Sequence, residues 1–133
     1  VRILGPERSA TQIELAQTDC RNIGIKAPVR SSGDTKGTPG VTLRGPNGTL
    51  TVPEGVMIAD RHIHMTPAQA AAFGLADGDR VQVKIDGPKP GVMGGVLIRA
   101  NDKCALDFHI DTDDGNAFLL KQGQLVTVLG KEE

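Results

Sequence analysis

The sequence predicts a mainly β protein, and two features of the chain support this. First, 17 glycines and 8 prolines are spread over 133 residues. They separate short segments of about 5–9 residues, the spacing of a small β-barrel or sandwich. Second, several segments alternate apolar and polar residues with the period of two that a half-buried strand requires. Hydrophobic residues make up 38% of the chain, which argues against wholesale disorder.

The first half is predicted to consist of short strands separated by turns and one loop. Gly5 and Pro6 end the first strand, and the stretch 30–40 is a loop by composition. Residues 45–48, Gly-Pro-Asn-Gly, have the composition of a hairpin turn. The predicted strands of this half cover residues 1–4, 11–16, 41–43 and 49–52.

The second half contains the clearer helix signals. Thr66 and Gln69 form a capping box, which predicts a short helix that ends at Gly74. A second short helix is predicted to begin with Thr112 as its cap. The predicted strands of this half cover residues 56–63, 80–85, 92–100, 104–110 and 125–129.

Charge and composition exclude two classes of partner. Fifteen lysines and arginines against 16 aspartates and glutamates give a net charge of -1, whereas a protein that neutralises nucleic-acid phosphates carries a basic excess. Three Phe and no Trp or Tyr argue against a base-stacking surface. No apolar run approaches the roughly 18–20 residues that a membrane span needs. We therefore expect neither a nucleic-acid nor a membrane partner.

The cysteines and the N-terminus indicate a cytoplasmic protein. Cys20 and Cys104 form no Cys-x-x-Cys pair, and we expect two reduced thiols. The N-terminal residues lack the features of a signal peptide and begin without Met. We therefore expect a processed or truncated piece of a longer chain.

The three histidines are the candidates for metal chemistry. His62 and His64 form His-x-His in a predicted strand, so they point to the same face, about 6.5–7 Å apart along the backbone. His109 lies in another predicted strand. Two ligands from one strand and a third from another can build a three-histidine zinc site with an open position. Histidines with a purely structural role are the alternative.

Carboxylates near the histidines extend this hypothesis. Asp60, Asp107 and Asp111 each lie two residues from a histidine and can accept hydrogen bonds from imidazole N–H groups. The run from Asp111 to Asn116 fails the calcium-loop pattern, because Asn116 replaces the required glycine. It is better explained as the acidic start of a helix.

Two residues of the first half are ambiguous from the residues alone. Glu14 lies on the polar face of a predicted strand, near Arg8. A solvated carboxylate and a surface cation are the ordinary explanations. No motif of a nucleophilic serine, a phosphate-binding loop or a dinucleotide site is present.

Several motifs in order nevertheless resemble one known family. They are VRILGP at 1–6, TQIE at 11–14, GTPG at 37–40, GVMIADRHIHM at 55–65 and LDFHIDTD at 106–113. On these motifs the chain resembles the PduL-type phosphate propanoyltransferases, the phosphotransacylases of bacterial microcompartments. The likeness covers nearly the whole chain.

This resemblance implies an activity and a set of site residues. Such enzymes interconvert acyl-CoA, here propanoyl-CoA or another short acyl thioester, and phosphate with acyl phosphate and free CoA. The family uses two zinc ions. By resemblance, His62, His64 and His109 are ligands of one zinc and Glu14 is a ligand of the other. Arg8 matches an arginine that faces the phosphate.

The resemblance also implies an architecture and partners. We expect two small β-barrels with short capping helices, residues 1–59 forming most of one and 60–133, with the three histidines, most of the other. The family has a further N-terminal portion whose Arg-His-x-His motif completes the second zinc site and which gives each barrel a strand. We therefore expect a separate N-terminal segment or a homo-oligomer as partner. A microcompartment lumen is the alternative location to the cytoplasm.

Two other functions stay open. Residues 66–83 resemble the helix-turn-strand unit of double-psi barrels, and that fold also serves as a binding module. Such a module has no need of three convergent histidines. A zinc hydrolase would use the same histidines to activate water. It would release CoA without phosphate, whereas a transferase requires phosphate.

Overall fold

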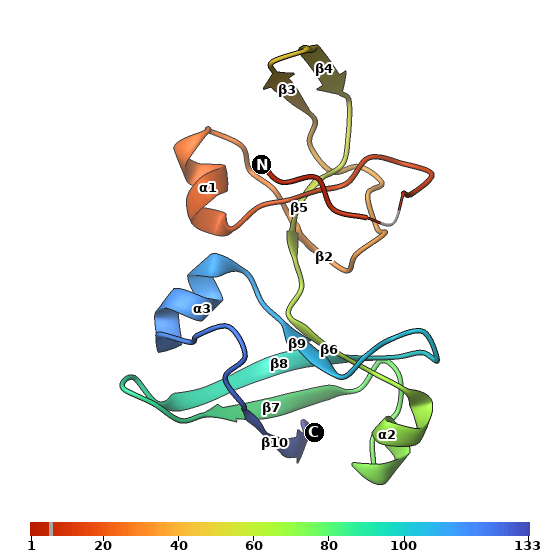
Figure 1. The fold of residues 1–133 in the computed structure, drawn as a ribbon, viewed down its shortest axis with the longest axis vertical. Helices are drawn as coiled ribbons and strands as arrows, with labels where there is room; N and C mark the ends of the chain where they lie inside the picture. Colours follow the sequence, from red (N-terminus) through yellow and green to blue (C-terminus); the bar gives the residue numbers. More distant parts are fainter. Residues whose placement is uncertain (6) are drawn as a thin grey trace. The chain divides into compact units, whose positions relative to one another are not determined.

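The computed structural model describes residues 1–5 and 7–133, and it confirms a mainly β protein with few short helices. The chain divides into two compact units, which we call unit 1, Val1–Ala59, and unit 2, Asp60–Glu133 (Figure 1). The described residues form no closed barrel, so the two-barrel architecture stays a proposal. None of the described helices is long and apolar enough to cross a membrane.

Unit 1 is built on short parallel strands and a hairpin. Its three-stranded sheet has the order β1-β5-β2, with both neighbours parallel to β5. The predicted hairpin is confirmed as β3 and β4, joined at Pro46 and Asn47. Ile13, Val52 and Val56 form the small hydrophobic core of unit 1. The elements are β1 (Ile13–Glu14), α1 (Gln17–Asn22), β2 (Val29–Arg30), β3 (Val41–Gly45), β4 (Gly48–Val52) and β5 (Val56–Ala59).

One expected strand of unit 1 is absent, and one helix was not expected. Residues 1–4 form no strand, and Val1 and Ile3 are 94% and 98% exposed, because no neighbouring strand pairs with this apolar segment. Pro6, expected to end that strand, lies outside the described residues. The helix α1 was not predicted, because its N-cap Ala16 provides no side-chain hydrogen bond. Burial of Cys20 attaches this helix to unit 1.

Unit 2 is a five-stranded sheet with one apolar face. Its strand order is β10-β7-β8-β6-β9, and only β6 and β8 are parallel. Alternation along β7 places Val81, Val83 and Ile85 in the core. The elements are β6 (His62–Met65), α2 (Pro67–Ala72), β7 (Arg80–Ile85), β8 (Gly91–Ala100), β9 (Asp107–His109), α3 (Thr112–Phe118) and β10 (Thr127–Lys131).

The predicted strand 56–63 is divided in the structure. β5 ends at Ala59 and β6 begins at His62, and the boundary between the units falls between Ala59 and Asp60. The side chains of the two intervening residues turn into ion pairs, Asp60 with Arg80 and Arg61 with Asp114. Because Asp60 and Arg61 form these ion pairs, the strand is interrupted at these two residues and is not continuous from 56 to 63.

The ends of three other elements also differ from the expectation. β9 is shorter than the predicted strand 104–110, and β10 is shifted toward the C-terminus, so Lys131 lies within it. The helix α3 is capped by Asp111, whose carboxylate accepts a hydrogen bond from the backbone N–H of Asp114 at 2.8 Å. The expectation of Thr112 as the cap is therefore wrong by one residue.

The capping box of α2 is confirmed and yields a stability prediction. The hydroxyl oxygen of Thr66 accepts from the backbone N–H of Gln69 at 3.2 Å, and the Gln69 side chain accepts from the backbone N–H of Thr66 at 2.9 Å. Thr66→Ala removes one of these bonds and should lower the unfolding free energy by about 1 kcal/mol. Denaturant titration measures this change. Thr66→Ser retains the accepting oxygen and should stay near the wild type; equal losses in both variants would contradict the capping role.

Candidate functional site

Strand register brings the three histidines together on the sheet of unit 2. In the antiparallel pair of β6 and β9, His62 lies directly opposite His109. Directly opposed residues share a face, and residues two apart along a strand also share it. His64 is therefore on the same face as the other two, whereas Ile63 and its partner Phe108 pack with the apolar core.

The imidazole nitrogens of this cluster are close enough to bind one metal ion. Nε2 of His62 lies 3.1 Å from Nε2 of His64, and one ligand atom from each of the three residues lies within 4.8 Å of the others. Tetrahedral zinc with Zn–N bonds of about 2.0–2.1 Å separates its ligand nitrogens by roughly 3.4 Å. Small ring rotations would satisfy this geometry, so the residues fit a three-histidine zinc site.

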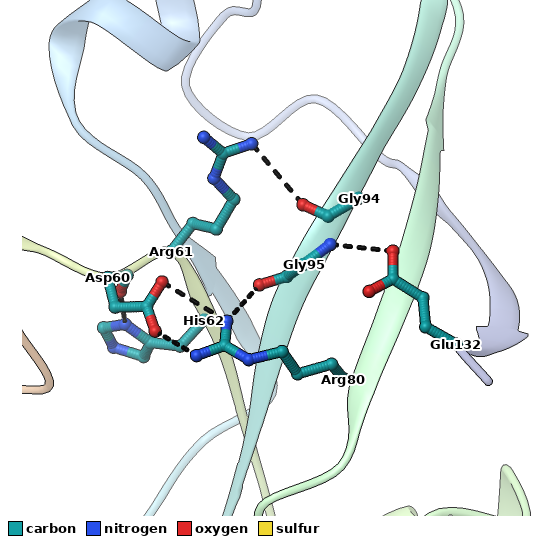
Figure 2. A network of polar contacts seen from close by, with 7 residues as sticks. All are labelled: Asp60, Arg61, His62, Arg80, Gly94, Gly95 and Glu132. Carbon is teal, nitrogen blue, oxygen red and sulfur yellow. Dashed lines mark hydrogen bonds and ion pairs between the residues drawn. The ribbon is translucent and has the colours of Figure 1, made fainter. Parts of the chain in front are cut away.

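A backbone hydrogen bond orients His62, which is only 8% exposed. Its Nδ1 lies 2.7 Å from the carbonyl oxygen of Asp60 (Figure 2). A carbonyl only accepts, so Nδ1 carries the proton and Nε2 keeps its lone pair toward the cluster. The expectation that the Asp60 carboxylate is the acceptor is wrong: this carboxylate pairs with Arg80 at 2.6 Å.

His64 has an unexpected sulfur partner. Its Nδ1 lies 2.9 Å from Sγ of Cys104. The contacts are all satisfied when the Cys104 thiol donates to Nδ1 of His64 and Nε2–H of His64 donates to Nε2 of His62. Sequence reasoning missed Cys104, because the two residues are 40 positions apart. Neither Cys20 nor Cys104 forms a disulfide bond with another described residue.

The third histidine is the most accessible of the cluster. His109 is exposed, and its Nε2 lies 3.5 Å from the carboxylate of Asp107. Asp107 is therefore a carboxylate neighbour of a histidine, as expected. Asp111 instead caps α3 through its carboxylate, which corrects its expected role beside His109.

Burial and neighbouring charge favour the neutral form of His64. Partial burial lowers the pKa of His64, and the positive charges of His62, His109 and Arg99 lower it further, while Asp107 opposes them. Arg99 is the register partner of His64 on β8. Among the described residues no group forms an ion pair or hydrogen bond with its guanidinium. Neutral imidazole is the form that binds a metal.

The two remaining predicted site residues belong to unit 1. Glu14 is exposed on β1, where its carboxylate accepts a hydrogen bond from the Gln12 side chain. Arg8 is exposed and lies outside the strands. The structure thus brings together His62, His64 and His109 in unit 2, and the roles of Glu14 and Arg8 stay proposals.

The lowered pKa of His64 predicts a pH dependence. Its folded-state pKa is below the ordinary value of 6.5, so the folded chain binds fewer protons than the unfolded chain near that pH. The contribution of His64 to stability is therefore complete above pH 6.5 and is lost as the pH falls through the folded-state pKa. NMR titration of the His64 ring in metal-free protein should give a midpoint below 6.5. A midpoint at or above 6.5 would contradict the assigned environment.

Comparison with known proteins agrees with the motifs. The family model described as phosphate propanoyltransferase matches residues 1–121. A phosphate propanoyltransferase of Thermotoga maritima is 47% identical over 97% of this chain and 62% of the relative. Those of Salmonella typhimurium and Rhodopseudomonas palustris are 48% and 45% identical over 88% and 98% of this chain. The chain spans about three fifths of the length of these relatives, 56–62%. With these matches and the resemblance of its motifs, the chain belongs to the phosphate propanoyltransferase family.

Proposed function

We propose that this chain is part of a phosphate acyltransferase that interconverts acyl-CoA and phosphate with acyl phosphate and CoA. The acyl group is propanoyl or another short chain. One observation carries the proposal: in a member of this family, three histidine ligand atoms lie within 4.8 Å of one another. Three protein ligands leave a fourth position for a substrate oxygen.

His62, His64 and His109 are the proposed metal ligands. Imidazole nitrogen suits zinc well, and binding through Nε2 of His64 would move its proton to Nδ1, which faces Sγ of Cys104. A bound zinc ion supplies Lewis-acid polarisation of a carbonyl or phosphate oxygen. The hydrogen bond from His62 Nδ1 to the Asp60 carbonyl, 2.7 Å long, keeps Nε2 available as the ligand atom.

Arginine side chains are the proposed phosphate partners. The guanidinium group matches the geometry of phosphate oxygens and stays charged at every working pH. By family resemblance Arg8 has this role. Arg99 lies beside His64 in the register of β6 and β8 and places a positive charge next to that histidine.

The proposed reaction needs no protein nucleophile. A phosphate oxygen attacks the carbonyl carbon of the thioester, a C–O bond forms, and the C–S bond then breaks. CoA leaves as the thiolate and takes up the proton that the attacking phosphate gives up. The guanidinium groups orient the phosphate for this attack and offset its charge.

Completion of the site involves groups beyond the three-histidine cluster. Glu14 is the proposed carboxylate ligand of a second zinc ion, with further ligands from a separate N-terminal segment or from a second copy of the chain. Together with that segment the two units would form the two small barrels. Residence in a bacterial microcompartment is proposed on the family resemblance alone.

The metal site leads to a direct test. Purified protein should contain zinc, and His109→Ala should lose the ion bound by the three histidines while the fold survives, because one of three protein ligands is removed. Elemental analysis measures zinc per chain, and circular dichroism checks the fold. Asp102→Ala, at an exposed position outside the cluster, is the control. Equal zinc contents in the wild type and His109→Ala would rule out this ligand set.

The reaction class is tested by phosphate dependence. Thiol release from propanoyl-CoA, followed with a thiol-reactive dye, should require phosphate. Arg8→Ala should raise the KM for phosphate by about tenfold, the scale of one lost charge-assisted bond. Arg44→Ala, which removes an exposed arginine of the same unit, is the control. CoA release that is independent of phosphate would favour a hydrolase, and an unchanged KM in Arg8→Ala would exclude Arg8 as the phosphate clamp.

A further inference from the structure

An ion pair lies next to the three-histidine cluster and connects β7 with the start of β6. Nη2 of Arg80 lies 2.6 Å from Oδ2 of Asp60, and Nη1 lies 3.4 Å from Oδ1. The guanidinium therefore holds both carboxylate oxygens, as Figure 2 shows. The Asp60 side chain is only 16% exposed, whereas that of Arg80 is 46% exposed. Arg80 and His62 share Leu97 of β8 as their register partner, so they lie in one row across the sheet.

Arg80 is itself held in place by a second set of contacts. Its Nη1 also donates to the carbonyl oxygen of Gly95, and its own carbonyl accepts from the backbone N–H of Glu132 at 2.8 Å. The Glu132 carboxylate in turn accepts from the backbone N–H of Gly95 at 2.8 Å. The register of β7 and β8 shifts here, and Gly95 has φ +67, a conformation that favours glycine. The irregularity of β8 thus provides a fixed acceptor for Arg80.

This network controls the residue that orients His62. Asp60 is the first residue of unit 2, where the chain arrives from unit 1, and no β-ladder includes it. Its side chain is bound to Arg80, and its carbonyl oxygen accepts a hydrogen bond from Nδ1–H of His62 at 2.7 Å. If the carboxylate were released, the carbonyl would be free to turn away. His62 would then lose one of the two contacts that favour its Nδ1–H tautomer, the other being the hydrogen bond that its Nε2 accepts from His64.

We propose that Arg80 is a positioning residue for the three-histidine site. It holds Asp60 by the carboxylate, keeps the Asp60 carbonyl on Nδ1 of His62, and so keeps Nε2 of His62 as a ligand atom. In metal sites, a group that directly hydrogen-bonds a ligating histidine, as the Asp60 carbonyl does here, changes metal affinity by about 10–100-fold when it is removed. The inference deepens the proposed function and rests on its metal site, but the effect on the His62 ring exists without any metal.

Two measurements on the full chain test this inference. In metal-free Arg80→Ala, nitrogen NMR of the His62 ring should show a larger share of the proton on Nε2 than in the wild type, which carries it on Nδ1. The zinc Kd, measured against a competing chelator, should rise by about tenfold or more. Arg80→Lys keeps the positive charge, but its single ammonium group replaces the two nitrogens that contact the Asp60 carboxylate. This variant should bind zinc more tightly than Arg80→Ala and less tightly than the wild type. If Arg80→Ala does not fold, Asp60→Asn tests the same link and should change both readouts in the same direction.

The chain offers a matched control. Lys131 and Asp79 form an ion pair in the same unit, also 2.6 Å long, in which the carboxylate is 15% exposed. Lys131→Ala should cost similar stability and leave the His62 tautomer and the zinc Kd unchanged within about twofold. Equal effects of both variants, or an unaltered His62 ring in Arg80→Ala, would overturn the positioning role. Absence of zinc binding by the wild type would instead refute the proposed metal site, and the NMR comparison would still decide the role of Arg80.

Discussion

The pairing register of β6 with its two neighbours is the constraint on which the candidate site depends. His62 lies opposite His109 on β9, and His64 lies beside Arg99 on β8. A shift of one residue on β9 would move His109 to the core face and Phe108 to the histidine face. The burial of Ile63, Ile98 and their apolar neighbours opposes such a shift. Hydrophobic packing on one face of the sheet therefore maintains the polar cluster on the other.

The same sheet explains why the three histidines differ in exposure. His62 is buried and oriented by a backbone carbonyl, whereas His109 is exposed at the β9 edge. His64 is intermediate, and its lowered pKa keeps it neutral near pH 7. Exposure thus increases from His62 through His64 to His109.

Polar contacts at the start of unit 2 give the cluster its support. Asp60 and Arg61 interrupt a run of apolar residues and pair with Arg80 and Asp114. The interruption ends β5 and allows β6 to begin with His62. Burial raises the pKa of the Asp114 carboxyl, while the charge of Arg61 opposes this. The side chains that end β5 are thus also those that control the orientation of the His62 ring.

Local patterns in the sequence determined the hairpin, the cap of α2, the alternation of β7 and the common face of His62 and His64. These depend on turn chemistry and on the strand period of two, which act within a few residues. The third histidine was expected from the sequence, but only the tertiary structure decided that it lies opposite His62 on β9, that Cys104 contacts His64 and that Arg80 holds Asp60. It also left residues 1–4 unpaired. Strand pairing and ion pairs join residues that are distant along the chain, and no local sequence pattern specifies which distant residue becomes the partner.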